Sequence, residues 1–224
     1  ARQFRDLDDQ VELGTRNIKV ALKGLRRLAR EGLAEELDID GTIRGTARRG
    51  YLDLQLRPEL RNRVKVLLFL DVGGSMDPHV RLCERLFSAA RAEFKHLEYF
   101  YFHNCVYERL WRSNARRHAE RFSTWDVLRK YGRDWKVIFV GDASMAPYEI
   151  THVGGSVEHR NEEAGATWLR RLVEAYPSSA WLNPERIADW GYIPSIGLVR
   201  ELLQDRMYPL TVEGLERAVQ ALRR

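Results

Sequence analysis

The chain has 224 residues, of which 44% are hydrophobic and 31% charged, and its formal net charge is +5. This composition excludes a disordered or fibrous protein, and the length is sufficient to bury a sizeable core. A modest positive charge permits an acidic partner or a nucleic acid but does not require one.

The cysteines and the apolar runs indicate the cellular compartment of the protein. Cys83 and Cys105, the only cysteines, provide neither a disulfide framework nor a zinc-ligand spacing. No secretory signal opens the sequence, and no apolar run approaches the ~20 residues needed to cross a bilayer. We therefore expect a reduced, cytoplasmic protein with no membrane partner.

Residues 1–62 predict a helical and basic N-terminal extension. Apolar residues recur every three or four positions from residue 15 to about residue 30, which predicts an amphipathic helix. The charged stretch REGLAEE at residues 30–36 favours a helix over a strand, whereas the alternating YLDLQL at residues 51–56 favours an edge strand. We expect this extension to pack on a core domain at residues 63–224.

The sequence LDIDGT at residues 37–42 imitates the Asp-x-Asp-Gly-Thr turn of haloacid-dehalogenase-type phosphatases. In those enzymes a buried strand precedes the turn, but here the preceding segment favours a helix. The second acidic motif of that family is also incomplete, because no further acid follows Asp142 in ASMAPY. We interpret the segment as a helix end and a turn, with a phosphatase that uses Asp38 and Asp40 as an alternative.

The stretch RVKVLLFLDVGGSM at residues 63–76 predicts a strand followed by an acidic turn. Its apolar run is typical of a strand buried on both faces of a parallel sheet. Asp71 ends the run, and the residues GGS that follow favour a tight turn. Open α/β sheets carry their sites in this position, beyond the carboxyl end of a central strand. An amphipathic helix is predicted at residues 79–95.

Residues 97–111 predict a pair of aromatic-rich strands. The sequences LEYFYFH at residues 97–103 and CVYERLW at residues 105–111 are separated only by Asn104. Because so short a link joins antiparallel strands, we expect an antiparallel pair.

A second buried strand, WKVIFV at residues 135–140, also leads to an acid, Asp142. Before it, STWD at residues 123–126 matches a helix capping box that contains Thr124. Two central strands thus carry carboxylates, those of Asp71 and Asp142, at the same end. Strand and helix alternate from there to the C-terminus. The expected fold is therefore α/β, a doubly wound and mostly parallel sheet with helices on both faces.

This order of strand, D-x-G-x-S turn, helix, Thr before a helix, and strand ending in Gly-Asp resembles the von Willebrand factor A (VWA) domain and its metal-ion-dependent adhesion site (MIDAS). The resemblance covers residues 63–224 and implies a Rossmann-like fold. It also implies that the turn and two further loops hold one divalent cation. The positions that match the metal site are Asp71, Gly73, Ser75, Thr124 and Asp142.

The sequence departs from the VWA pattern at Gly73, which stands where the family usually has a serine. One hydroxyl ligand is therefore missing, and water or the neighbouring backbone has to replace it. The resemblance implies Mg²⁺, with Mn²⁺ or Ca²⁺ as alternatives, and Mg²⁺ requires six oxygen ligands. An incomplete protein shell leaves a position for a carboxylate of a partner. We therefore expect a protein-binding module and not an enzyme.

Within the VWA proteins, the sequence resembles the bacterial CoxE-like subgroup. The resemblance rests on TIRGTAR at residues 42–48, FLDVGGSM at residues 69–76 and FHN-x-x-YE at residues 102–108. Members of this subgroup are thought to act beside MoxR-type AAA+ ATPases in protein remodelling or metalloenzyme maturation. The resemblance therefore implies such an ATPase as the protein partner.

Two further readings are alternatives. An arginine-rich segment beside aromatic strands fits either a nucleic-acid-binding surface or a solvated face, and it contains Arg112, Arg116, Arg117 and Arg121. Hydrolysis at the metal is the other alternative. It lacks an obvious general base, because no histidine pairs with a serine in a nucleophile turn such as G-x-S-x-G.

Overall fold

The computed structural model describes residues 14–26 and 28–223, which fall into two compact units. One unit combines the segment up to Leu25 with Lys65–Arg224, and the other is Arg26–Val64. Residues 1–13 of the predicted extension lie outside the described residues, and the packing of the second unit on the first stays a prediction. No helix within the described ranges is long and apolar enough to span a membrane.

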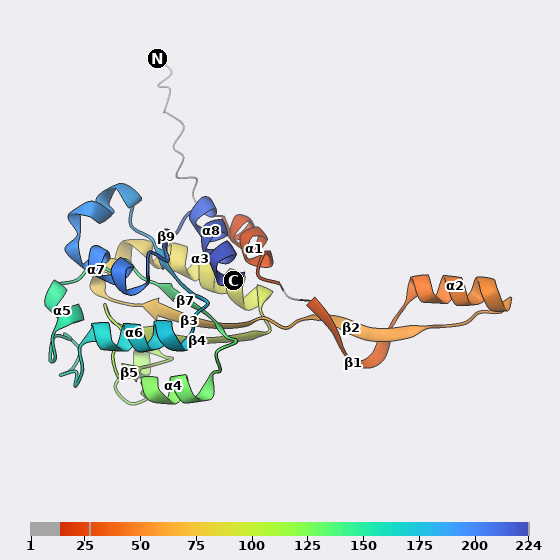
Figure 1. The fold of residues 1–224 in the computed structure, drawn as a ribbon, viewed down its shortest axis with the longest axis horizontal. Coiled ribbons are helices and arrows are strands. Elements are labelled where there is room, and N and C mark those ends of the chain that lie inside the picture. The colour runs from red at the N-terminus through yellow and green to blue at the C-terminus, as the bar shows by residue number, and fades with distance from the viewer. Residues whose placement is uncertain (1–13, 27, 224) are drawn as a thin grey trace, which may run out of the picture. The chain divides into compact units, whose positions relative to one another are not determined.

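The larger unit is built on a five-stranded sheet, and its α/β fold confirms the predicted class (Figure 1). All neighbouring strands pair in parallel. In spatial order the strands are β4 (His96–Phe102), β3 (Lys65–Asp71), β7 (Lys136–Val140), β8 (Ser179–Asn183) and β9 (Met207–Pro209). Strands β3, β7 and β8 are buried almost throughout, because helices cover both faces of the sheet.

Helices cover both faces of the sheet (Figure 1). One face carries α1 (Thr15–Lys23), α3 (Val80–Glu93) and α8 (Val212–Arg223), and the other carries α4 (Thr124–Lys130) and α6 (Gly165–Ala175). Shorter elements complete the unit: the 3₁₀ helices η1 (Gly74–His79), η2 (Asn114–Arg116) and η3 (Ile187–Tyr192), the strands β5 (Arg109–Leu110) and β6 (Phe122–Ser123), and the helices α5 (Pro147–Thr151) and α7 (Pro194–Leu202).

A row of aromatic side chains fixes the register of the sheet just before its carboxyl edge. Phe69 pairs with Phe100 on one side and Phe139 on the other, and Phe139 pairs in turn with Trp181. The Phe69 and Phe139 rings stack at 5.1 Å, and the Phe139 and Trp181 rings at 5.5 Å. Because every strand leaves this row at the same level, the residues that follow it meet at one edge.

The predicted antiparallel strand pair is largely wrong. Strand β4 pairs in parallel with β3, and only isolated bridges join it to the following segment, Tyr101 with Trp111 and His103 with Cys105. The segment after Asn104 is a buried loop, in which Cys105, Val106 and Tyr107 pack into the hydrophobic core. These buried apolar residues gave the segment the composition of a strand, although β5 pairs with β6 instead.

The smaller unit is an antiparallel pair of strands, β1 (Leu28–Leu37) and β2 (Leu56–Asn62), with helix α2 (Ile39–Arg49) between them in the chain. Three predictions fail here. The first helix ends at Lys23 instead of continuing to residue 30, and the stretch REGLAEE lies in strand β1. Of YLDLQL at residues 51–56, only the last residue, Leu56, belongs to a strand, β2. Strand β1 is held by pairing with a partner distant in sequence, which overrides its local helix propensity.

The LDIDGT segment begins helix α2, so its interpretation as a helix end and a turn is also wrong. Asp38 is the N-cap, and its Oδ1 accepts a hydrogen bond from the Gly41 amide at 3.1 Å. The same oxygen lies 3.3 Å from Nη1 of Arg57. Asp38 therefore caps a helix after an antiparallel strand, and the buried parallel strand of a phosphatase site does not precede it.

Candidate functional site

Asp71 ends strand β3 as a buried carboxylate, with 5% of its surface exposed. Its Oδ1 accepts hydrogen bonds from the amides of Gly73 and Asn104, both at 2.9 Å, whereas its Oδ2 is buried without a partner among the described residues. Burial raises the pKa of Asp71 to about 7; the Gly73 amide opposes this rise and the charge of Asp142 adds to it. The site thus holds a carboxylate whose charge is poorly compensated.

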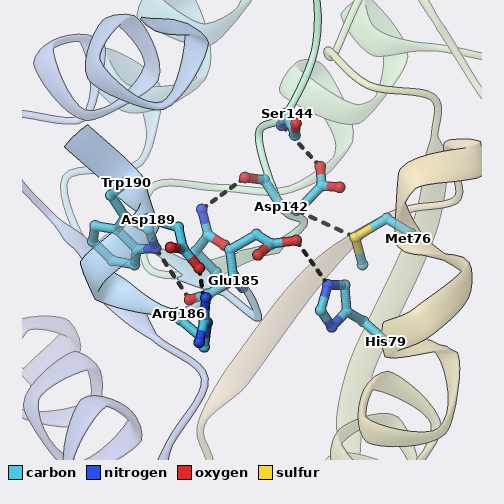
Figure 2. Close-up of polar contacts among 9 residues, drawn as sticks. Met76, His79, Asp142, Ser144, Glu185, Arg186, Asp189 and Trp190 are labelled. Atoms are coloured by element: carbon cyan, nitrogen blue, oxygen red, sulfur yellow. Dashed lines mark hydrogen bonds and ion pairs between the residues drawn. The ribbon is translucent and has the colours of Figure 1, made fainter. Parts of the chain in front are cut away.

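Asp142 lies two residues beyond strand β7 and is 1% exposed. Its Oδ1 accepts a hydrogen bond from the Ser144 amide at 2.9 Å, and its Oδ2 is buried, with no hydrogen-bond partner in the part of the chain that the structure describes. Burial raises the pKa of this carboxyl as well, while the Ser144 amide and the neighbouring Ser75 hydroxyl lower it. Its amide donates to Sδ of Met76 at 3.2 Å (Figure 2).

The two carboxylates lie close together because their strands are neighbours. A Cβ added at Gly141 would lie 2.8 Å from the Asp71 Cβ and 3.1 Å from its Oδ2. The Asp71 side chain therefore packs directly against the residue that precedes Asp142. Met76 and Ser75, from the turn after β3, also reach Asp142. The structure thus brings together four of the five predicted site positions: Asp71, Gly73, Ser75 and Asp142.

Thr124, the fifth predicted position, begins helix α4 and is fully buried. Its hydroxyl donates to the carbonyl oxygen of Tyr107, and its amide donates to the Glu108 carbonyl at 3.0 Å. No hydrogen bond within the described residues joins Thr124 to either aspartate. The Thr124 hydroxyl proton is therefore engaged by the Tyr107 carbonyl, and no described contact links this residue to the carboxylate pair.

The donor set suits a hard divalent cation. Asp71 and Asp142 each present a buried oxygen without a partner, and Ser75 adds a hydroxyl. Oxygen ligands of these types are those that Mg²⁺ prefers. Residues 14–26 and 28–223 contain no group of three or more His, Cys, Asp or Glu side chains that could hold a metal, so hydroxyl, amide or water oxygens would have to complete the shell.

A cavity of about 320 Å³ adjoins Asp71 and is lined in part by Asp71, Gly73, Met76 and Cys83. Asp142 is not among its lining residues, so the cavity reaches the site from the Asp71 side. Both cysteines are free thiols, and burial raises the pKa of Cys83 to about 12. The Cys83 thiol is therefore protonated at neutral pH, which makes it a poor metal ligand.

The VWA resemblance noted in the sequence is supported by comparison with protein families. Residues 13–109 match the family described as VWA domain containing CoxE-like protein. The match supports a CoxE-like VWA domain, and the parallel sheet with helices on both faces agrees with it. Comparisons with curated proteins and with solved structures gave no significant match.

The CoxE-like match covers only part of the site. It includes the turn from Asp71 to Ser75, and also Asn104, but it ends before Thr124 and Asp142. Sequence reasoning missed Asn104 as a site residue because it expected an antiparallel link there. Since β4 is parallel to β3, Asn104 follows the carboxyl end of its strand just as Asp71 and Asp142 do. A polar residue at the carboxyl end of a strand was the sequence signal that could have identified Asn104.

Beyond the CoxE-like match, a polar network supports Asp142 from strand β8 (Figure 2). Asn183 is fully buried; its Nδ2 donates to the Asp142 carbonyl at 2.8 Å, and its Oδ1 accepts from the Glu185 amide at 2.8 Å. The Glu185 carboxylate lies 3.1 Å from Nε2 of His79. These three residues tie the loops after β7 and β8 to η1, and sequence reasoning missed them because no spacing motif contains them.

Proposed function

We propose that the chain is a non-enzymatic, metal-dependent protein-binding VWA module. The observation that carries the proposal is the pair of buried carboxylates, Asp71 and Asp142, each with one oxygen that has no partner. Two uncompensated buried carboxylates are costly, and a divalent cation between them would remove that cost. Mg²⁺ is the first choice because the surrounding donors are oxygens, with Mn²⁺ or Ca²⁺ as alternatives.

The cation would be reached from the cavity beside Asp71, where a partner's carboxylate could complete the shell. An open coordination position suits docking better than hydrolysis, since no hydrogen bond or ion pair within the described residues joins a histidine to either aspartate. His79 acts on Asp142 only electrostatically, and its ring pairs with Glu185. The CoxE-like match favours a MoxR-type AAA+ ATPase as the partner, because members of that subgroup are thought to work beside such ATPases. The metal would then connect the module to an acidic side chain of the ATPase.

Metal binding is tested by calorimetry. We expect Mg²⁺ and Mn²⁺ to bind the purified protein and to bind Asp71→Asn at least about tenfold more weakly, because a neutral amide replaces one charged ligand. Asp126→Asn is the matched control, since the Asp126 side chain is 69% exposed and pairs with Arg129 at the surface. Equal affinities of the wild type and Asp71→Asn would contradict a metal site.

Partner binding is tested with a purified MoxR-type ATPase and the immobilised protein. We expect retention in Mg²⁺, release by a chelator, and no retention by Asp142→Asn, because all three depend on the same cation. Asp126→Asn should retain the ATPase as the wild type does. Retention that survives both the chelator and Asp142→Asn would mean that any contact with the ATPase does not use this site.

The nucleic-acid alternative receives no support from the arginine-rich segment. Arg112 stacks on Phe100 and Phe122 and bonds to Glu98, Arg116 pairs with Glu120, and Arg117 lies 3.7 Å from Glu158. These guanidinium groups already have carboxylate partners within the chain. No observation favours nucleic-acid binding over the VWA module, and it stays a prediction from sequence.

A further inference from the structure

We propose that Asn104 supplies, through its side-chain Oδ1, the oxygen ligand that Gly73 lacks. The inference rests on the proposed metal site and names a residue of that site. It explains why the turn after β3 carries glycine at this position. The ligand that is missing from the loop after β3 is then supplied by the loop after β4.

The first step is steric. A Cβ added at Gly73 would lie 2.1 Å from Oδ1 of Asn104 and 3.3 Å from Oδ1 of Asp71. A side chain at residue 73 would therefore require the Asn104 side chain to move, because the Asn104 amide oxygen occupies the space that it would take. The serine expected there from the VWA pattern would place its hydroxyl in the same region.

The second step is the orientation of the amide. Nδ2 of Asn104 donates to Oε2 of Glu149 at 2.9 Å, and Glu149 is 4% exposed. A carboxylate accepts hydrogen bonds but cannot donate them when ionised, so it selects the NH₂ group and turns Oδ1 toward Gly73. Oε1 of Glu149 is itself held by the Ala146 amide at 3.2 Å. Within the described residues, Oδ1 of Asn104 accepts no hydrogen bond and is available as a ligand.

The third step is the backbone of Asn104, which has a φ of 56°. This left-handed conformation brings its amide to Oδ1 of Asp71 at 2.9 Å and folds the side chain back over the turn. Asparagine adopts it more readily than most residues, and glycine adopts it freely. The turn alone could be formed by glycine, whereas the hydrogen bond to Glu149 requires the amide NH₂ group and a ligand role requires the amide oxygen.

The test compares three variants by Mn²⁺ calorimetry and by water-proton relaxation of bound Mn²⁺. Asn104→Gly keeps the backbone conformation, and we expect it to weaken Mn²⁺ binding about tenfold or more and to admit one additional water to the ion. Gly73→Ser alone clashes with Asn104 and should also weaken binding. The double variant Gly73→Ser/Asn104→Gly should recover most of the affinity and the wild-type hydration, because the serine hydroxyl returns to the vacated space.

Three outcomes separate the inference from the function on which it rests. If the wild type binds Mn²⁺ and Asp71→Asn does not, but Asn104→Gly binds with unchanged affinity and hydration, then the Asn104 inference alone is overturned. A double variant that binds no better than Asn104→Gly would count against the Asn104 ligand in the same way. If the wild type binds no Mn²⁺, both the metal site and the Asn104 ligand fall together.

Discussion

Replacing Asp71 by asparagine should stabilise the metal-free protein at pH 8, whereas replacing it by alanine should destabilise it. Asparagine keeps an oxygen that accepts from the Gly73 and Asn104 amides, but it carries no charge. Relief of the buried charge should raise the free energy of unfolding by about 2 to 4 kcal/mol. Alanine also removes the charge, but it leaves the amides of Gly73 and Asn104 buried without an acceptor, and that cost should exceed the gain.

The pH dependence of stability tests whether the buried charge of Asp71 is the reason why Asp71→Asn is more stable. In the folded protein the pKa of Asp71 is raised from 3.8 to about 7, so the native state binds this proton more tightly than the unfolded chain does. The wild type therefore loses stability as the pH rises from about 4 to about 7, and the difference from Asp71→Asn grows over the same window. Urea unfolding of both proteins in chelator at pH 4, 6 and 8 measures this difference in the free energy of unfolding. A difference that does not change with pH would contradict a buried charge at Asp71.

Mg²⁺ should offset most or all of the stability difference between the wild type and Asp71→Asn. A cation that binds only the folded wild type stabilises it by about 2.7 kcal/mol at a hundred times its dissociation constant. Asp71→Asn should gain little, so the gap between the curves should narrow or change sign. Unfolding curves of both proteins with Mg²⁺ and with chelator provide the comparison, and parallel shifts in the two proteins would indicate a cation that binds elsewhere.

The central strands were predictable from sequence because their environment imposes a simple pattern. Strands β3 and β7 are buried on both faces, so Val66 to Leu70 and Val137 to Val140 must all be apolar. The acids that end these runs were equally visible, and the parallel register then brings Asp71 beside Gly141 and Asp142. The placement of Asp71 and Asp142 therefore follows from the two apolar runs and from the parallel arrangement of their strands.

The direction of β4 was not predictable in the same way. Residues 105–107 are apolar because they enter the core as a loop, and a periodicity of two does not distinguish such a loop from a strand. Reading them as a hairpin arm placed Asn104 in a tight turn instead of at the sheet edge. Its contacts with Gly73 and Glu149 join residues far apart in sequence, so only the folded chain reveals them.

The antiparallel pair β1 and β2 shows a second reason why sequence alone did not predict the structure. Helix-favouring residues form β1 because most of them pair with residues of β2, from Leu37 with Leu56 to Leu28 with Asn62, which lie far along the chain. Local propensity contributes at most about 1 kcal/mol per position and does not record a distant partner. The Asp38 N-cap and the Gly50 C-cap, with a φ of 74°, are boundary signals that the interpretation of residues 37–42 as a helix end and a turn did not use.

Phe139→Ala is expected to lower the free energy of unfolding by about 3 to 5 kcal/mol, the largest stability loss that we predict. The ring is fully buried and stacks at 5.1 Å on Phe69 and at 5.5 Å on Trp181. Its removal leaves a cavity in the middle of the aromatic row and ends both stacking contacts. Urea unfolding measures the loss, and Tyr192→Ala is the control, since Tyr192 is 85% exposed and should change stability by less than about 0.5 kcal/mol.

Phe139→Leu separates the role of the row in stability from its role at the site. Leucine refills much of the cavity, so the loss should fall to about 1 to 2 kcal/mol. A domain is stable by only about 5 to 15 kcal/mol, so Phe139→Ala would populate unfolded chains that bind no metal, whereas Phe139→Leu would stay folded. If the row acts only by fixing the register, Phe139→Leu should bind Mn²⁺ as the wild type does. Weaker binding by this folded variant would mean that the stacked rings also hold Asp142 in place, through the Trp181 indole that donates to the Gly141 carbonyl at 2.7 Å.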